Sequence, residues 1–237
     1  MEFPEKIVKD IQQFMTEADL HEAYLFGGAV LDSLINKDAK INDYDMCVKD
    51  ESTFYKTLAN LKKSQSNVSD VMRTHNIYAV INHPQLGQID FSCMNPEDNG
   101  ILNIEKIYAR FNLNRNGLSY QIVDKYDAIE GMKQGKIRLA SLPEKEGAYN
   151  ILRRFLAVAG KYGIDIKPGG VNQQFINQMN EAFKANYPYV AQDRVRCLSR
   201  LGASLKRSKN RPEFVKNLHD QKIFEQSFPN IHELLGK

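Results

Sequence analysis

The first part of the chain alternates between the apolar spacing of helices and that of strands. Residues 1–19 place apolar side chains on one helical stripe, which predicts an amphipathic helix. The apolar run 23–26 predicts a buried strand that the pair Gly27-Gly28 ends, and residues 29–35 return to helical spacing. Polar and apolar residues then alternate over 43–48, which predicts a half-buried strand.

The middle of the chain continues this mixture of periods. Residues 52–61 have the spacing of a helix, and the segments 77–82 and 87–94 predict a hairpin. A stretch of mixed character follows. It leads to a predicted helix at 127–136 and a short predicted strand at 136–139.

Beyond residue 141 only helical spacing remains. The predicted helices lie at 144–162, 171–186, 188–206 and 211–235. The whole pattern predicts an α+β protein. We expect a small mixed β-sheet head with flanking helices at residues 1–140, followed by an all-helical domain at residues 141–237.

Two carboxylates share one face of the strand predicted at 43–48. Side chains at i and i+2 of a strand point the same way, so Asp43 and Asp45 lie together while Tyr44 faces the other side. Adjacent anions repel each other, and a divalent cation between them removes that repulsion. Alone, such a pair is more often a solvated strand end. Asp90, in the second strand of the predicted hairpin, is either a charge at a sheet edge or a third metal ligand.

The glycine pair at 27–28 lies between a predicted strand and a predicted helix. Because glycine has no Cβ, the backbone N–H groups of such a turn can approach a phosphate closely. Taken alone, a tight turn without a ligand explains the pair better. Combined with the acidic pair, the glycines predict a phosphate site beside a metal site.

Composition restricts the class of protein. The chain is 42% hydrophobic and 26% charged, which is typical of soluble globular proteins. No apolar run approaches the roughly 20 residues that cross a bilayer, and the N-terminus lacks the order of a secretory signal. Three widely spaced cysteines fit a reducing compartment. We expect a cytoplasmic protein without membrane contact and without a structural zinc site.

Charge divides the chain near the end of the strand signal. Lys and Arg number 17 against 22 Asp and Glu in residues 1–149, but 12 against 4 in residues 150–213. An acidic front segment suits metal ions, and a basic segment behind it suits a polyanion such as RNA. The basic residues could instead form a solvated helical face. As a cluster, however, they favour binding of RNA.

These pieces resemble the head-domain signature of the DNA polymerase β nucleotidyltransferase superfamily, in the branch of tRNA CCA-adding enzymes and bacterial poly(A) polymerases. The signature reads G-G-x-V-R-D and then D-x-D, which residues 27–32 and 43–45 follow. Residues 110–120 look like a divergent R-R-D-F-T-I-N-A-x-x-Y segment, and residues 129–138 look like I-E-D-L-x-x-G-x-I-R. Residues 146–153 lie where the E-D-x-x-R-x-L-R motif of the helical neck falls.

The sequence also departs from this family at motif positions. Leu31 replaces the arginine of R-D, and Phe111-Asn112 replaces an Arg-Asp pair. Gly147 and Asn150 stand in place of the neck Asp and Arg that select C and A in the family. The resemblance therefore implies no CCA specificity, and a single-nucleotide or relaxed preference stays open.

The resemblance implies two-metal transfer of a nucleotide from an NTP, ATP or CTP, to an acceptor. It assigns Asp43, Asp45 and Asp90 as the catalytic residues and as the ligands of Mg²⁺ or Mn²⁺. The implied nucleotide-binding residues are Gly27, Gly28, Asp32, Asn112, Asn116, Asn150, Arg153 and Arg154. The leading acceptor is the 3′ end of an RNA, with tRNA as the candidate. Expected RNA contacts are Arg194, Arg196, Arg200, Lys206 and Arg207.

Two alternatives stay open. The same chemistry can modify a protein hydroxyl or a small molecule, as other members of the superfamily do. The other alternative is a catalytically silent RNA-binding protein, which the divergence of the neck and middle motifs makes credible. Retention of Asp43, Asp45 and Asp90 argues against it, since a silent site has no need of carboxylates that repel one another.

Overall fold

The computed structural model describes residues 2–36, 38–64, 66–73, 76–134, 137, 140, 148–162, 191–208, 211–220, 222 and 225. The chain divides into two compact units. The first unit comprises Met1–Gly100 and Ile104–Ile129, and the second comprises Ile101–Asn103 and Glu130–Lys237. The domain boundary expected after residue 140 lies somewhat beyond this division and stays a prediction.

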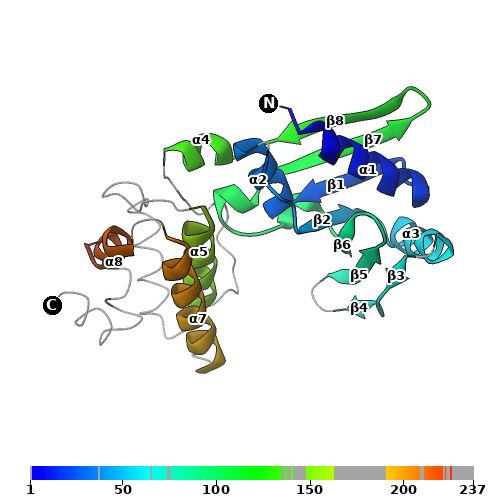
Figure 1. Cartoon of the computed structure of the whole chain (residues 1–237). Coiled ribbons are helices and arrows are strands. Elements are labelled where there is room, and N and C mark those ends of the chain that lie inside the picture. Colours follow the sequence, from blue (N-terminus) through cyan, green and yellow to red (C-terminus); the bar gives the residue numbers. More distant parts are fainter. Residues whose placement is uncertain are drawn as a thin grey trace. The chain divides into compact units, whose positions relative to one another are not determined.

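The first unit is built on one mixed β-sheet of eight strands (Figure 1). The strands are β1 (Glu22–Phe26), β2 (Asp43–Val48), β3 (Asn67–Val68), β4 (Met72–Arg73), β5 (Ile77–His83), β6 (Gly87–Cys93), β7 (Tyr108–Asn114) and β8 (Gly117–Val123). Their order is β3-β5-β6-β2-β1-β7-β8, with β4 paired to β5. Strands β2 and β6 run parallel and the other pairs run antiparallel. The predicted α+β class and mixed sheet are confirmed.

Helices flank this sheet. They are α1 (Glu5–Glu17), α2 (Gly28–Ile35) and α3 (Glu51–Lys63), with short 3-10 turns at Pro96–Asp98 and Asn103–Glu105. Helix α4 (Ala128–Lys133) lies across the division between the two units. Helix α3 begins at an N-cap, Asp50, whose carboxylate accepts the Thr53 N–H at 2.8 Å. The helices predicted at 1–19, 29–35 and 52–61 are confirmed within a few residues at each end.

Aromatic packing joins α1 and α3 to one face of the sheet. Phe91 of β6 stacks on Phe54 of α3 with ring centroids 5.3 Å apart, and it meets Phe14 of α1 edge to face at 5.9 Å. All three side chains are fully buried. Burial of a ring of this size contributes about 1.5–3 kcal/mol to stability. This packing fixes β6, the strand that carries Asp90.

The middle stretch, for which the pattern predicts no element, forms the antiparallel hairpin β7–β8. At its turn, the Asn114 side chain accepts the Asn116 N–H at 2.8 Å, and Gly117 has a φ of +108° that favours glycine. The dipeptide Asn116-Gly117 between alternating runs is itself a hairpin signal. The sheet therefore extends further on the β1 side than the sequence predicts.

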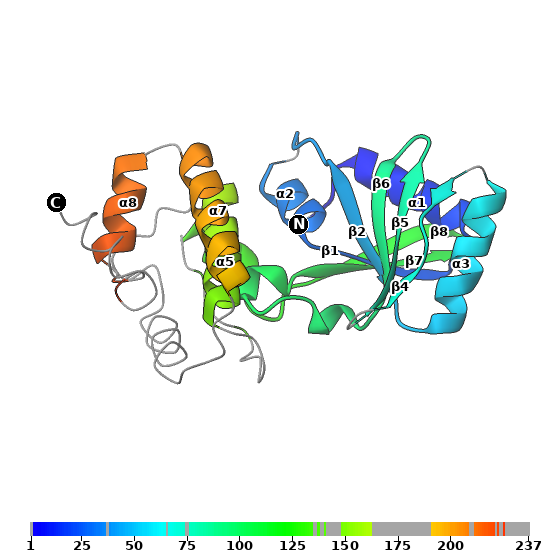
Figure 2. The same cartoon turned by 90° about the horizontal axis from the view of Figure 1, so that it is seen from below.

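The second unit contains α5 (Ala148–Tyr162), α7 (Ala191–Arg207) and α8 (Arg211–Asp220) among its described residues. Helices α5 and α7 lie side by side (Figure 2). A Cβ added at Gly160 would lie 2.4 Å from the Cα of Ser204, so the two backbones approach closely. The Ser204 hydroxyl donates to the Leu156 carbonyl across this contact.

One predicted helix in this part of the chain is shorter than expected, and two other predicted elements lie largely outside the described residues. The helix predicted at 211–235 ends at Asp220, and Lys222 has a left-handed φ of +54°. The helix predicted at 171–186 and most of the strand predicted at 136–139 lie outside the described residues. Among the helices that the structure describes, none has the length and apolar character needed to cross a membrane.

Candidate active site

Gly27 joins β1 to α2 in a conformation and a space that suit only glycine. Its φ is +69°, in the left-handed region that other residues rarely adopt. A Cβ at this position would lie 2.4 Å from Oδ2 of Asp45. The backbone that begins α2 therefore lies directly against the Asp45 carboxylate. Gly28 is the first residue of the helix, and the half-buried Asp32 lies one turn further along it.

The strand register aligns two of the predicted carboxylates. Because β2 and β6 are parallel neighbours, Asp45 is paired with Asp90 and Asp43 with Gln88. Adjacent strands lie about 4.8 Å apart, and paired residues point to the same face of the sheet. Asp45 and Asp90 are both half-buried. The structure thus brings Gly27, Asp45 and Asp90 to one end of the sheet.

Asp43 lies on the same face as Asp45, further out at the beginning of β2. It is exposed, whereas Tyr44 between the two acids is buried on the opposite face. The Tyr44 hydroxyl donates to Oδ2 of Asp10 in α1 at 2.6 Å, and burial raises the pKa of that hydroxyl. This anchored tyrosine sets the facing of the strand, and the predicted alternation of Asp43, Tyr44 and Asp45 is confirmed.

The donor atoms suit a hard cation without forming a finished cage. Within the described ranges, no three His, Cys, Asp or Glu side chains converge closely enough to hold a metal ion. Mg²⁺ in nucleotide sites takes one or two carboxylates and completes its shell with water and substrate phosphates. The Asp45–Asp90 pair beside the glycine turn fits that pattern. Joint ligation by Asp43, Asp45 and Asp90 stays a prediction.

Sequence reasoning missed one polar neighbour of this site. The Gln88 side-chain amide donates to Oδ1 of Asp90 at 2.9 Å. Gln88 lies two residues before Asp90 on β6, so the same i, i+2 period that joins Asp43 to Asp45 is the signal that finds it. This hydrogen bond holds one carboxylate oxygen and leaves the other for a ligand.

Cys47 lies on the same face as Asp45, deeper along β2. Its side chain is fully buried within an apolar cluster with Tyr24, Phe26 and Tyr108. Burial raises the pKa of its thiol to about 12. The thiol is therefore protonated at neutral pH, and because only the thiolate binds metal strongly, Cys47 is not part of the ligand set.

Two predicted nucleotide-binding residues lie at the other end of the sheet. In the register of β1 with β7, Phe26 is paired with Tyr108 and Glu22 with Asn112. Asn112 thus lies about 13 Å along the strand from the end that adjoins the glycine turn. Asn116 lies beyond it, in the β7–β8 turn. The structure does not gather Asn112 and Asn116 with Gly27, Asp45 and Asp90, and their role in nucleotide binding stays a prediction.

The remaining predicted residues belong to the second unit. Helix α5 carries Asn150, Arg153 and Arg154, of which the two arginines are half-buried. Helix α7 carries the expected RNA contacts, among which Arg196, Arg200 and Lys206 are exposed. The side chains of Asn150, Arg194 and Arg207 lie outside the described part of the structure. Roles for all these residues stay predictions.

Solved structures share this fold, although no protein-family model and no curated protein matches the chain. The CCA-adding enzyme of Thermotoga maritima complexed with tRNA superposes with a TM-score of 0.68 and 17% identity, over 94% of this chain and 52% of that one. A CCA-adding enzyme with CTP gives 0.69 and 18%, over 95% and 52%. A tRNA nucleotidyltransferase with a primer tRNA and an ATP analog gives 0.63 and 17%, over 92% and 62%.

The chain therefore has the fold of tRNA nucleotidyltransferases of the CCA-adding type. The resemblance noted from residues 27–32 and 43–45 is confirmed at the level of fold. The chain spans about half the length of the CCA-adding enzymes that it matches, 52% in two of them.

Proposed function

We propose that this protein is a metal-dependent nucleotidyltransferase that transfers a nucleotide from an NTP, ATP or CTP, to the 3′ end of an RNA, with tRNA as the leading acceptor. One observation carries the proposal. The register of β2 with β6 places Asp45 beside Asp90, while the backbone of Gly27 lies against the Asp45 carboxylate. A carboxylate pair and a phosphate-accessible turn thus share one end of the sheet.

The glycine turn supplies the phosphate-binding half of the proposed site. The first N–H groups of α2 have no partner within the helix, and the helix dipole places partial positive charge at this end. The lack of side chains at Gly27 and Gly28 lets a triphosphate approach these groups. Since Asp45 adjoins the same turn, bound phosphate and carboxylate are close enough to share a cation.

The carboxylates supply the other half. Mg²⁺ or Mn²⁺, in a two-metal arrangement, would neutralise the phosphates and promote ionisation of the acceptor hydroxyl. In the transfer, the acceptor 3′ oxygen forms a bond to the α-phosphorus while the bond to the bridging oxygen breaks, and pyrophosphate leaves. Asp45 would face the triphosphate and Asp90 the acceptor, with Gln88 orienting the Asp90 carboxylate. Asp43 would complete the ligand set from the exposed end of β2.

Several observations support RNA as the acceptor. Proteins with this fold include CCA-adding enzymes described with tRNA, CTP and ATP. Helix α7 presents Arg196, Arg200 and Lys206 to solvent, where they would contact RNA phosphates. Arg153 and Arg154 of α5 are the proposed contacts to the incoming nucleotide. Because Gly147 and Asn150 replace the base-selecting pair of the resembled family, we expect one nucleotide or a relaxed choice rather than ordered addition of C, C and A.

A labelling experiment tests this function. The full chain is incubated with each α-labelled NTP, total RNA and Mg²⁺ or Mn²⁺, and RNA and protein products are resolved on gels. We expect label in RNA of tRNA size, and none when EDTA is present. Label confined to protein would move the acceptor to a protein hydroxyl. No product from any NTP would overturn the proposal and favour a silent RNA-binding protein.

A further inference from the structure

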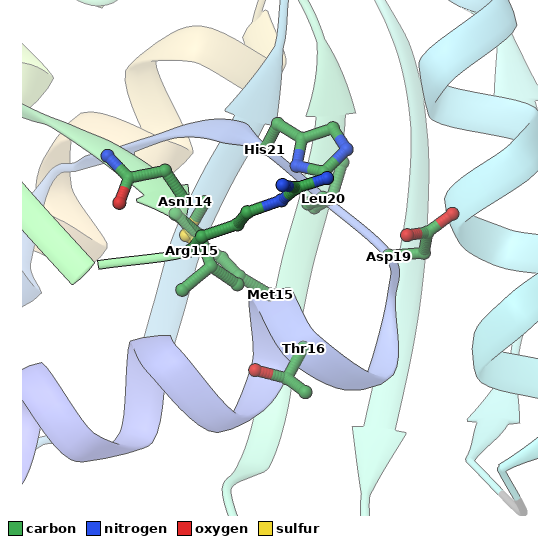
Figure 3. A pocket seen from close by; sticks show the side chains of 8 residues that line it. Met15, Thr16, Asp19, Leu20, His21, Asn114 and Arg115 are labelled. Atoms are coloured by element: carbon green, nitrogen blue, oxygen red, sulfur yellow. The ribbon is translucent and has the colours of Figure 1, made fainter. Parts of the chain in front are cut away.

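A pocket with an apolar floor and a polar rim opens at the opposite end of the sheet in the first unit (Figure 3). It has a volume of about 590 Å³, within the range of small-molecule sites. It forms where the loop from α1 to β1 meets the turn of the β7–β8 hairpin. Its lining residues are Met15, Thr16, Asp19, Leu20, His21, Leu113, Asn114 and Arg115.

This pocket is separate from the proposed transfer site. His21 precedes β1 and Gly27 follows it, so the two ends lie about 20 Å apart along an extended strand. The Leu113 N–H donates to the His21 carbonyl at 2.9 Å, which joins the hairpin to the start of β1. One wall therefore comes from the end of α1 and the loop after it, and the other from the β7–β8 hairpin. The pocket does not depend on the transfer chemistry proposed above.

The floor of the pocket is apolar and well ordered by packing. Met15 and Leu20 are buried, with exposed fractions of 0% and 3%, and Leu113 is half-buried. Met15 and Leu20 support the floor from beneath, and Leu113 is the branched aliphatic side chain that stays accessible to the face of a planar ring. This floor fits a flat, partly apolar group better than a small inorganic ion.

The rim carries one uncompensated positive charge. In the part of the chain that the structure describes, the Arg115 guanidinium has no ion pair and no hydrogen-bond partner. Asp19, the acid in the lining, is instead paired with Lys56, whose Nζ lies 2.7 Å from its Oδ2. Figure 3 shows Arg115 extending in the direction of His21, while the Asp19 carboxylate points away. The open mouth therefore offers a charged guanidinium to an anion.

The other polar groups of the rim suit a heterocycle. His21 and Asn114 are exposed, and each presents hydrogen-bonding groups at the pocket. Imidazole and guanidinium planes also stack on nucleobases, and guanidinium groups donate charge-assisted hydrogen bonds to phosphate. Each part of a nucleotide thus has a counterpart: an apolar floor for the base, polar groups for its edge, and Arg115 for the phosphate.

From this combination we infer that the pocket binds a nucleoside 5′-phosphate, either as a free mononucleotide or as one residue of an RNA strand. The base lies on the apolar floor, where Leu113 is the accessible side chain, and the phosphate contacts Arg115. Because Arg115 carries a fixed positive charge, binding needs no divalent cation. Binding without a cation distinguishes this pocket from the acidic end of the same sheet, where a phosphate would bind together with a metal ion.

Adenosine 5′-monophosphate and adenosine are the probes for this site. The full ¹⁵N-labelled chain is titrated with each in the presence of EDTA, and the amide signals of His21, Leu113, Asn114 and Arg115 are followed. We expect AMP to shift these signals saturably and to bind about tenfold or more tightly than adenosine, which lacks the phosphate. Equal affinity for the two probes, or the absence of shifts at these residues, would overturn the inference.

Arg115→Gln provides the matched variant, with Arg73→Gln as control. Arg115 is exposed in the hairpin turn, so its replacement leaves the fold intact. We expect Arg115→Gln to weaken AMP binding about tenfold while adenosine binding stays unchanged. Arg73, another exposed arginine of the first unit, contacts Glu51 and Tyr55 away from the pocket, so its replacement should have no effect. Unchanged AMP affinity in Arg115→Gln excludes the phosphate contact.

A short oligoadenylate distinguishes the two sources of the ligand. If the pocket receives one residue of an RNA strand, the oligonucleotide binds more tightly than AMP, and the difference shrinks as salt rises. If the pocket receives a free mononucleotide, AMP binds at least as well as the oligomer. Either result supports a nucleoside phosphate site at Arg115.

Discussion

The two ends of β1 present opposite charges to a phosphate. At the Phe26 end, Gly27 lies against Asp45, which is aligned with Asp90, so the side chains there are anionic. At the Glu22 end, the pocket next to His21 carries the uncompensated guanidinium of Arg115. Five residues of strand separate the two environments.

The two proposed sites would hold the same ligand group in different ways. An acidic site binds a phosphate only together with a cation, and that cation also activates the reacting groups. A basic site binds the phosphate directly and activates nothing. The acidic end is thus suited to chemistry and the basic end to recognition.

The largest expected effect follows from removing a charge at the acidic end. Asp45→Asn keeps the size of the side chain but weakens its hold on a cation. We expect the rate of nucleotide incorporation to fall at least about a thousandfold, which corresponds to about 4 kcal/mol of transition-state stabilisation. The free energy of unfolding should change by less than about 0.5 kcal/mol, because the substitution also relieves repulsion with Asp90. Incorporation assays and urea denaturation measure the two quantities.

Asp70→Asn is the control for this charge change. Asp70 is exposed in the same unit and lies outside the candidate site. Its replacement should leave incorporation at the wild-type rate. Wild-type activity in Asp45→Asn would remove the acidic end from the chemistry.

The next effect tests the contact between the glycine turn and the carboxylate. Gly27→Ala and Gly117→Ala both place a Cβ on a residue with positive φ, which costs about 1–2 kcal/mol of stability. Only at Gly27 does the new Cβ meet the Asp45 carboxylate, whereas nothing lies within 4 Å at Gly117. Displacement of that carboxylate by about 1 Å should lower incorporation about a hundredfold. Gly117→Ala, at the opposite end of the sheet, should retain activity.

Urea denaturation with incorporation assays separates the two glycine variants. Equal loss of activity in both would mean that backbone strain alone is responsible. The proposed contact would then have no catalytic role. A selective loss in Gly27→Ala would show that the position of the Asp45 carboxylate limits the reaction.

Local periods in the sequence were enough to predict most elements of the first unit. The alternation at 43–48 and the helical spacing at 52–61 arise from neighbours in sequence, and the structure confirms both. The pattern does not predict the hairpin at 108–123, because residues 110–120 resemble a divergent family motif more than two alternating strands. The local signal that indicates this hairpin is the Asn116-Gly117 dipeptide at its turn.

The arrangement of the site required information beyond local periods. Sequence predicted that Asp43 and Asp45 share a face, because that follows from strand geometry. The pairing of Asp45 with Asp90 depends on which strands become neighbours, and contacts between residues distant in sequence decide this. The Arg115 pocket joins a loop and a turn that are distant in sequence, so no local pattern predicts it.

The smallest effect concerns RNA binding and tests how far the acceptor extends. Each phosphate contact removed lowers the slope of log affinity against log salt by about 1. Arg196→Gln with Arg200→Gln on α7 should therefore reduce the slope by about 2 and weaken tRNA binding at low salt. An unchanged slope would exclude α7 from the RNA interface.

Arg115→Gln in the same assay reports on the basic end of the sheet. A reduction of the slope by about 1 means that the bound strand reaches the pocket beside His21. No reduction means that the bound strand does not reach that pocket, since a strand held there would lose one phosphate contact with the arginine.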